Sequence, residues 1–491
     1  MSFDEPFTTA LGLATIGALL AISAILSRTS RIGIPVALLF LVVGMLAGSE
    51  VLGWIHFEDH GLAFRLGTVA LALILFDGGL NTTLATLRSG LAPAGVLATA
   101  GVAGTALLVA LTARLLGFGW GEALILGAVV SPTDAAAIFS TLRGSGMQLK
   151  RRVQATLELE SGLNDPMGVI LTLSITEAVL RGGGLNLTVL AMVPVQFAVG
   201  VGFGLAFGYG AHWLLRLRPL ASGLYPVLTV GVACLAFGVP TLVWGSGFLS
   251  VYIAGLILGS KPLPHHAGIL RVHDFLAWFF QVVMFLALGL LVFPSDLLDV
   301  AGVGIVIALA LALVARPAIV ALCLLPFGYS LREIVYIGWV GLRGAIPIIL
   351  AAFPVMVQVP GSITLFNVVF FVVVVSALVQ GGSIRWITPW LKLQADVPPP
   401  PPATIEISSA RPLREGLMTF YVHRASAVAG AEIQELPFPK DAAVILIARG
   451  EDLIAPRGHN RLEVGDHVHV FSRREDAPMV RLLFGQEPHE T

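Results

Sequence analysis

Residues 157–170 read LELESGLNDPMGVI and place Glu158, Glu160, Asn164, Asp165 and Pro166 inside a chain that is apolar on both sides. A charged side chain in the middle of a membrane costs about 2.5–3.5 kcal/mol on insertion scales, so it normally faces the interior of a helix bundle and marks an ion or proton path. The stretch therefore predicts a helical membrane protein with a functional carboxylate in its interior.

The composition supports this class. The chain has 491 residues, of which 56% are hydrophobic and 12% charged, and its mean hydropathy is +0.89. Soluble domains carry about 25% charged residues. The net charge of -1 argues against binding to nucleic acid, which needs a basic face. We find no phosphate loop and no metal-site spacing of Cys and His, so we expect a non-enzymatic protein without a cofactor.

A helix that crosses a bilayer needs roughly 20 mainly apolar residues, and such runs recur up to residue 391. We predict an all-α polytopic membrane protein with about thirteen spanning segments, near 8–26, 32–49, 62–80, 91–115, 120–142, 151–180, 187–216, 222–238, 241–260, 272–293, 298–326, 332–356 and 362–391.

The charges in the connections predict the orientation. Connections after even-numbered segments hold one clear positive charge, Arg181, with Arg65 and Arg114 near their edges. By the positive-inside rule we predict a multi-pass protein of the cell inner membrane, with its N-terminus outside and its C-terminal domain in the cytoplasm. Connections after odd-numbered segments hold most basic residues: Arg28, Arg31, Arg88, Arg143, Lys150, Arg151, Arg152, Arg216, Arg218, Lys261, Arg271, Arg332 and Lys392.

The character of the chain changes after residue 392. Five consecutive prolines at 398–402 form a semi-rigid spacer. We therefore divide the chain into a membrane domain at 1–392, a linker at 393–410 and a small α+β domain at 411–485.

Within this last domain, β-rich runs at 418–424, 442–450 and 466–472 predict strands. The runs at 430–436 and 475–485 predict helices. A unit of this size lies near the lower limit for a stable core, so we expect a second copy or the membrane domain to stabilise it.

Helical spacing sorts the polar residues of the opening stretch. Glu158, Ser161 and Asp165 lie at i, i+3 and i+7, which is one helix face. Pro166 has no N–H and leaves the Gly162 carbonyl without its helical partner. A carboxylate beside free oxygens is a ligand set for a hard monovalent cation, so we assign ion binding to Asp165. For Glu158 and Glu160 we favour structural ion pairs.

Two other segments contain helix breakers. In residues 131–134, Ser-Pro-Thr-Asp, the proline removes a helical hydrogen bond, and Thr133 and Asp134 favour helix N-termini. We predict an unwound stretch there, since irregular backbone at membrane depth is tolerated around a cavity; a kink capped by Asp134 is the alternative. Residues 339–354, WVGLRGAIPIILAAFP, predict a second broken helix. Such a pair indicates an inverted-repeat transporter.

Buried charges elsewhere suggest partners. Arg343, inside the second broken helix, is the natural partner of Glu160 in a structural ion pair. Arg316 is a second buried cation for which the sequence offers no obvious partner. Asp77, in LILFDGGLN, either approaches the same cavity or caps a helix end.

The motifs SPTDAAA, ESGLNDP and GLRGAIP, in this order, resemble those of bacterial cation:proton antiporters of the sodium/proton exchanger superfamily. The resemblance covers the whole chain and is greatest to potassium/proton antiporters with a C-terminal RCK-C (TrkA-C-like) domain, which RLEVGDHVHVFSRRED resembles. Some relatives carry a further soluble domain after it, which we do not expect here.

The resemblance implies roles for single residues. Asp165 binds either the cation or a proton, and its neutral neighbour Asn164 is typical of electroneutral exchangers. Thr133 and Asp134 lie at the crossing of the broken helices, and Ser161 supplies an oxygen. Asp77 occupies a place near the cavity. Glu160 pairs with Arg343. The resemblance also implies a homodimer and a small-molecule or nucleotide regulator at the C-terminal domain.

We therefore predict export of K⁺ in exchange for H⁺ by alternating access, with both ions competing for Asp165. A sodium/proton antiporter is the alternative, because sequence does not reveal sub-ångström differences in cavity size. A gated cation channel is a third interpretation, since RCK domains also regulate channels, but no TVGYG-like filter is present. A membrane receptor is a fourth.

Overall fold

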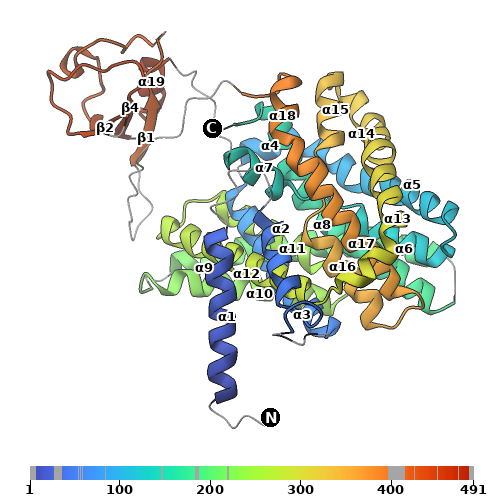
Figure 1. Cartoon of the computed structure of the whole chain (residues 1–491). Helices are drawn as coiled ribbons and strands as arrows, with labels where there is room; N and C mark the ends of the chain where they lie inside the picture. The colour runs from blue at the N-terminus through green and yellow to red at the C-terminus, as the bar shows by residue number, and fades with distance from the viewer. Residues whose placement is uncertain are drawn as a thin grey trace. The chain divides into compact units, whose positions relative to one another are not determined.

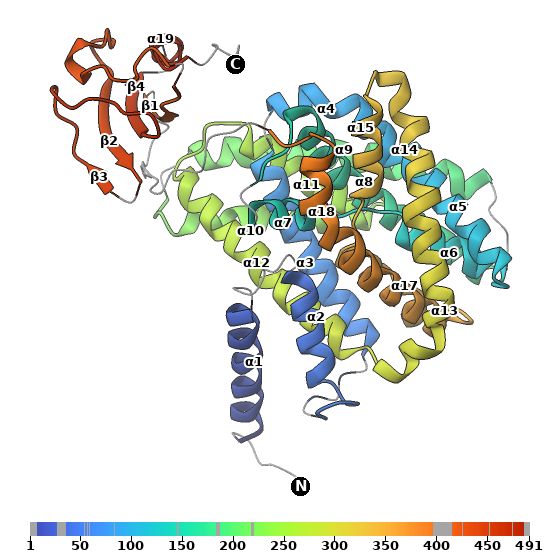
Figure 2. The same ribbon diagram turned by 45° about the horizontal axis from the view of Figure 1, so that its top comes forward.

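The computed structural model describes residues 7–26, 36–53, 55, 57, 59–82, 84–144, 147–182, 187–217, 220–395, 415–424, 426–450, 452–473 and 475–485. They form two compact units (Figure 1; Figure 2 shows a second view). The helical unit consists of Met1–Leu214, Pro226–Lys261 and Leu270–Ala395, and the other unit of Leu215–Tyr225, Pro262–Ile269 and Asp396–Thr491. From residue 396 on, the predicted linker lies outside the described residues.

One order of elements occurs twice in the helical unit: an interrupted long helix, a broken helix and a third long helix. The first set comprises α4 (Leu84–Val96), the π-helix η2 (Leu97–Gly101), α5 (Val102–Leu115), α6 (Trp120–Val130), α7 (Ala135–Gly144) and α8 (Arg151–Leu180). The second comprises α13 (Pro294–Ala310), the π-helix η3 (Leu311–Ala315), α14 (Arg316–Leu324), the 3₁₀ turn η4 (Leu325–Phe327), α15 (Leu331–Trp339), α16 (Ala345–Met356), α17 (Ser362–Ser376), the π-helix η5 (Ala377–Gly381) and α18 (Gly382–Trp390). The two predicted broken helices are α6–α7 and α15–α16.

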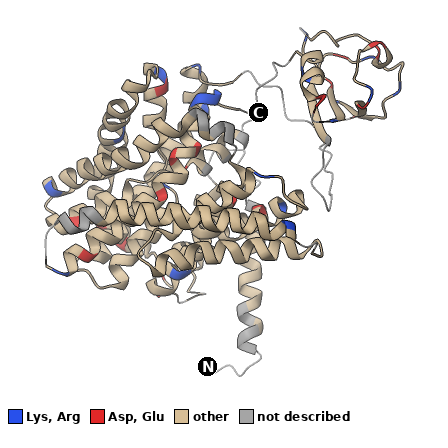
Figure 3. Ribbon diagram, turned by 180° about the vertical axis from the view of Figure 1, so that it is seen from behind, with Lys and Arg blue, Asp and Glu red and all other residues tan. Residues whose placement is uncertain are grey.

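The remaining helices precede or separate these sets. They are α1 (Phe7–Leu26), α2 (Val36–Ala47), α3 (His60–Asn81), α9 (Leu187–Leu217), α10 (Leu224–Leu242), α11 (Gly247–Gly259) and α12 (His266–Leu290). Charged side chains are sparse along the helices (Figure 3). Such helices are hydrophobic on all sides, as expected for segments that face either lipid or other helices.

Each of the thirteen predicted segments overlaps at least one helix of the described chain. Within that part, eight helices are long and apolar enough to cross a membrane, and five shorter apolar helices supplement them. Two of the shorter ones, α6 and α16, are halves of the broken helices. The polytopic membrane fold predicted from hydropathy is therefore confirmed.

Glycines allow α3 and α11 to pack with their backbones in contact. A Cβ at Gly255 would lie 2.4 Å from the Phe76 carbonyl oxygen, and one at Gly259 would lie 2.0 Å from that of Leu80. Small residues permit such approach between membrane helices. The α11 residue Tyr252 in turn contacts α8, since a Cβ at Gly162 would lie 2.6 Å from its ring. This packing supports the central part of α8.

The other unit contains a four-stranded antiparallel sheet in the order β1-β4-β2-β3. Its core includes Phe420, Ile447, Val468 and Phe484. The predicted strands and the last predicted helix are present. The elements are β1 (Glu415–Tyr421), the 3₁₀ turn η6 (Ile433–Glu435), β2 (Ala443–Arg449), β3 (Asp452–Ile454), β4 (His467–Arg473) and α19 (Ala477–Leu483).

The helix predicted at 430–436 is wrong, because only the three-residue turn η6 forms there. The backbone amides of Ile433 and Gln434 donate to the carbonyls of Asn460 and Gly458, at 3.0 and 2.9 Å. Pairing with this neighbouring loop takes the donors that an α-helix would direct to residues four positions earlier.

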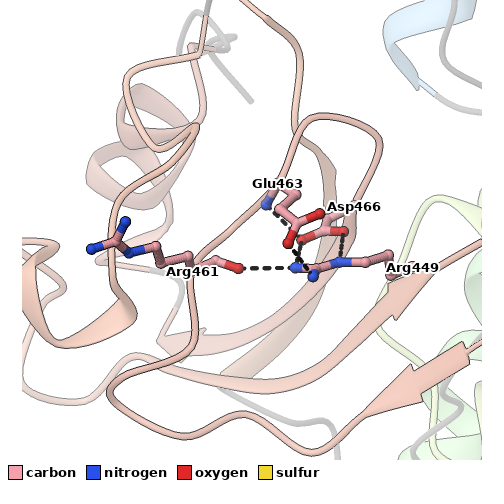
Figure 4. Close-up of polar contacts among 4 residues, drawn as sticks. All are labelled: Arg449, Arg461, Glu463 and Asp466. Carbon is pink, nitrogen blue, oxygen red and sulfur yellow. Dashed lines mark hydrogen bonds and ion pairs between the residues drawn. The ribbon is translucent and has the colours of Figure 1, made fainter.

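An ion-pair clip closes one end of the sheet (Figure 4). The guanidinium of Arg449 donates from Nε and Nη2 to the two carboxylate oxygens of Asp466, at 2.8 and 2.9 Å, and it also pairs with Glu463. Asp466 is fully buried, and its hydrogen bonds raise the pKa of Arg449. A bidentate pair of this kind is strong and directional, so it fixes the turn before β4 against the end of β2.

Replacing Arg449 by Met leaves the buried Asp466 without its partner, which costs about 1–3 kcal/mol. Hydrogen exchange of the β2 and β4 amides in the full-length protein should accelerate by roughly 5- to 150-fold. The control is Arg473→Met, which breaks an exposed pair with Asp441; surface pairs contribute about 0–1 kcal/mol. Equal acceleration in both variants would contradict the role of the clip.

Candidate functional site

The two broken helices interrupt at neighbouring positions. Residues 131–134 separate α6 from α7, and residues 340–344 separate α15 from α16. The backbone N–H of Asp134 donates to the Leu342 carbonyl at 2.8 Å. This bond joins the two non-helical stretches directly, so four half-helix ends meet in the interior of the helical unit.

Helix α8 packs against this crossing through polar contacts. Asn164 donates from Nδ2 to Thr133 Oγ1 at 2.7 Å, and Ser161 Oγ accepts from the backbone N–H of Ala135 at 3.1 Å. Residue 168 must be small here, because a Cβ on Gly168 would lie 2.1 Å from the Pro132 ring. The sequence-predicted residues Thr133, Ser161 and Asn164 are therefore brought together.

Asp165 lies beside these residues and is almost fully buried, with 4% of its surface exposed. Its Oδ1 atom and the Oδ1 atom of Asn164 have no hydrogen-bond partner within the described structure. Asp134 and Glu160 are electrostatic neighbours of Asp165. Buried polar atoms are normally bonded, and carboxylate and amide oxygens are ligands for hard cations. The two unbonded oxygens therefore make this a candidate site for a cation or a proton.

Asp134 bridges the two interruptions. Its Oδ1 accepts from the Ala137 backbone N–H at 3.2 Å and so caps α7. Its other oxygen lies against the start of α16, where a Cβ on Gly344 would be 2.0 Å away. Both an unwound stretch and a cap by Asp134 are present. A carboxylate is favoured near two helix N-termini because their dipoles are positive at that end.

The structure corrects one predicted ion pair. Glu160 pairs with Arg316, with 2.5 Å between Oε1 and Nη2, and not with Arg343; the side chains of Glu160 and Arg316 are both buried. Arg316 comes from the start of α14, 156 residues along the chain from Glu160. The predicted partner, Arg343, lies close by, since a Cβ on Gly341 would contact both arginines. Linear sequence does not reveal which of two neighbouring guanidinium groups reaches the carboxylate.

Arg343 instead satisfies backbone groups at the crossing. Its Nε donates to the Val130 carbonyl at 3.0 Å, and Nη1 donates to the Gly341 carbonyl. The last carbonyls of a helix have no intrahelical partner, so this positive side chain completes the C-terminus of α6. Gln380, in the π-helix η5, does the same for α15 by donating to the Trp339 carbonyl at 2.8 Å.

Gln380 and Ser376 were not predicted from the sequence as part of this site. Ser376 Oγ accepts from the backbone N–H of Arg343 at 3.3 Å and donates to Gln380 at 2.6 Å. A lone Gln and a Ser four residues apart in a strongly apolar helix were the available signal.

Asp77 lies on α3 and is bonded to Asn81, whose Nδ2 is 3.1 Å from Oδ1. Asp274 of α12 is an electrostatic neighbour of Asp77. The hydrogen bonds of Asp77 with Asn81 are within α3, and its predicted approach to the cavity stays a prediction. Among the described residues, no cluster of three or more His, Cys, Asp or Glu side chains is arranged to hold a metal ion.

Comparison with known proteins gives the family. The sequence profile of the sodium/hydrogen exchanger transmembrane region matches residues 17–390, and the profile of the TrkA-C domain matches residues 417–485. This chain belongs to the sodium/hydrogen exchanger family. The predicted resemblance is thereby confirmed, including the TrkA-C domain at the C-terminal side.

The alignments with two relatives extend over both the exchanger region and the TrkA-C region of this chain. The K⁺/H⁺ antiporter NhaP2 of Shewanella baltica (strain OS223) is 41% identical over 484 residues, which cover 96% of this chain and 83% of that protein. The K⁺/H⁺ antiporter NhaP of Alkalimonas amylolytica is 40% identical over 472 residues, which cover 95% of this chain and 82% of that protein.

A solved exchanger shares the fold. The sodium proton antiporter MjNhaP1 from Methanocaldococcus jannaschii, at pH 8, superposes with a TM-score of 0.67 over 78% of this chain and 99% of that one, at 22% identity. The present chain therefore has the polytopic helical architecture of that antiporter.

A double-mutant cycle tests the corrected ion pair. Arg316→Gln should lower the free energy of unfolding by about 3–5 kcal/mol, because it leaves Glu160 charged and buried without a partner. Adding Glu160→Gln should recover part of this loss, measured by denaturant unfolding in detergent. The same cycle between Glu160 and Arg343 should give a smaller coupling free energy than the cycle between Glu160 and Arg316. A larger coupling free energy with Arg343 would support the pair predicted from the sequence.

Proposed function

We propose that this exchanger carries K⁺ out of the cytoplasm in exchange for H⁺, and that both ions compete for Asp165. The observation that supports this most strongly is the buried Asp165 carboxylate with an unbonded oxygen, beside the unbonded oxygen of Asn164, at the crossing of two broken helices. Thr133, Asp134 and Ser161 supply further oxygens around it.

Coupling follows from the cost of burying charge. An isolated carboxylate in an apolar interior is strongly unfavourable, so the site moves through the membrane barrier when a proton or a cation has neutralised Asp165. The unloaded, charged site stays on one side. The pair Glu160–Arg316 contributes no net charge, and the carboxylate of Asp134 is offset by the N-termini of α7 and α16. Asp165 is then the group whose charge changes during exchange.

The identity of the cation follows from the relatives. Two proteins that match nearly the whole chain, at 41% and 40% identity, are K⁺/H⁺ antiporters. Sodium is the second candidate, because the Na⁺/H⁺ antiporter NhaS2 of Synechocystis sp. (strain ATCC 27184 / PCC 6803 / Kazusa) is 28% identical over 343 residues.

Further features of this function are part of the same proposal. Exchange of one monovalent cation for one proton at a single carboxylate moves no net charge, so transport is electroneutral. We assign the protein to the cell inner membrane with an outside N-terminus and a cytoplasmic C-terminal domain, as the basic residues of the connections favour. A homodimer, and a small molecule or nucleotide that regulates through the C-terminal domain, complete the proposal.

Neutralising the exchanging carboxylate is the first test. Asp165→Asn should reduce exchange in proteoliposomes to the rate of protein-free vesicles, because the amide holds neither a proton nor a cation by charge. Asp134→Asn should be similarly severe. The control Asp299→Asn changes an exposed acid on α13 and should retain the wild-type rate. Exchange at the wild-type rate by a well-inserted Asp165→Asn variant would contradict the proposed function.

The choice of cation needs a separate measurement. In proteoliposomes with an internal pH-sensitive dye and an imposed pH gradient, added K⁺ should dissipate the gradient at a several-fold lower concentration than Na⁺ across a pH series. Choline chloride controls for ionic strength. Dissipation of the gradient by Na⁺ with no response to K⁺ would contradict K⁺ transport and support Na⁺/H⁺ exchange.

A further inference from the structure

A basic pocket lies away from the ion-exchange site, at one end of the helical unit. Its volume is about 410 Å³, and three cationic side chains, Lys150, Arg332 and Lys392, line it. They precede α8, begin α15 and follow α18, respectively. The pocket thus gathers residues from three connections that are far apart in the sequence.

Hydrogen bonds of the backbone and of the Arg152 side chain hold the segments around the pocket together. The N–H of Lys150 donates to the Leu393 carbonyl at 3.0 Å, and that of Ala395 donates to the Gln148 carbonyl at 2.8 Å. Arg152, in the first turn of α8, donates to the Phe327 carbonyl at 2.7 Å, just before α15. The three cationic side chains are therefore carried on segments that are held together independently of any ligand.

Three cationic residues and one acid, Glu333, line the pocket, so its positive charge is only partly balanced. Within the described part of the chain, Lys150, Arg332 and Lys392 form no ion pair with another described side chain. The acid that lines the pocket, Glu333, accepts from the backbone N–H of Ser330 at 2.8 Å and so caps α15. Three like charges around one cavity repel each other and favour an anion between them.

The backbone conformation of Lys392 is a second unusual feature of the pocket. Its φ is +59°, in the left-handed region where glycine is the ordinary residue at a helix C-terminus. The conformation is unfavourable for a residue with a Cβ, yet this position, which lines the pocket, holds a lysine. Glycine would satisfy the turn but would remove one of the three charges.

Exposed apolar residues near the pocket favour a position at the level of the lipid headgroups. Trp386 and Trp390 on α18 are 67% and 76% exposed, and Leu331, which also lines the pocket, is 74% exposed. Tryptophan is enriched where a membrane helix leaves the hydrocarbon layer. Basic pockets between membrane helices at this level bind anionic headgroups.

We propose that the pocket formed by Lys150, Arg332 and Lys392 binds a phosphate group, carried by an anionic phospholipid whose acyl chains lie along α18. The three cations surround the phosphate, and the exposed tryptophans contact the chains. Because the pocket joins the connections that lead into α8 and α15, the bound phosphate holds together the segments that begin these two helices. This binding does not depend on which cation the protein exchanges.

The test uses the full-length protein in detergent and measures the thermal unfolding midpoint during titration with phosphatidylglycerol, phosphatidylcholine or inorganic phosphate. Phosphatidylglycerol should stabilise the wild type, and Arg332→Gln/Lys392→Gln should need at least a tenfold higher concentration for half of the effect. The matched control, Arg65→Gln/Lys440→Gln, removes an exposed arginine and an exposed lysine elsewhere and should respond like the wild type.

The outcomes separate the sources of the phosphate. Saturable stabilisation by inorganic phosphate at millimolar concentration, lost in Arg332→Gln/Lys392→Gln, would support the pocket with a soluble ligand in place of a lipid. Should this double variant not fold, Lys150→Gln replaces it in the test. The phosphatidylglycerol concentration that gives half of the stabilisation should then rise at least threefold. Equal responses of wild type, pocket variants and control to every addition would overturn the proposal.

Discussion

The interior of this exchanger depends on one constraint: a charge or an unpaired backbone group in an apolar environment must have a partner. Interrupting two helices at membrane depth creates free N–H and C=O groups, and the chain supplies a side chain for several of them. Asp134 caps α7, Arg343 completes α6 and Gln380 completes α15. Asp165 differs from Glu160, because no ion pair of the described structure includes it, and its Oδ1 atom has no hydrogen-bond partner there.

Under the proposed function, this difference separates the structural ion pair from the carboxylate that exchanges ions. Glu160 and Arg316 neutralise each other by direct contact, so neither needs to change its state when the protein moves. In the proposed mechanism, a proton or a cation that binds and leaves neutralises Asp165. A transporter built in this way couples its ions by electrostatics, since the barrier is low for either loaded form and high for the unloaded one.

The extent to which sequence predicted this structure differs from feature to feature. Asp165, Thr133 and Asn164 were predictable, because polar residues and helix breakers within apolar segments leave few interpretations. The strands at 418–424, 442–450 and 466–472 were predictable from their β-rich composition. The partner of Glu160 was not, since it depends on which of two arginines reaches it in three dimensions. The pocket of Lys150, Arg332 and Lys392 was also beyond sequence reasoning, because three distant connections build it. The roles assigned to Asp165, Asn164, Asp134, Thr133, Ser161 and Asp77 stay predictions until exchange is measured.

The central claim is that a proton and a cation exclude each other at Asp165. Proton release on cation binding measures this directly, in weakly buffered detergent solution with a pH-sensitive dye. Adding KCl to the purified protein should release protons, with choline chloride as the reference. At a pH below that at which the site loses its proton without a cation, the number of protons released should approach about one per chain. The Asp165→Asn variant should release none. Potassium binding detected by calorimetry without proton release at any pH would contradict the account.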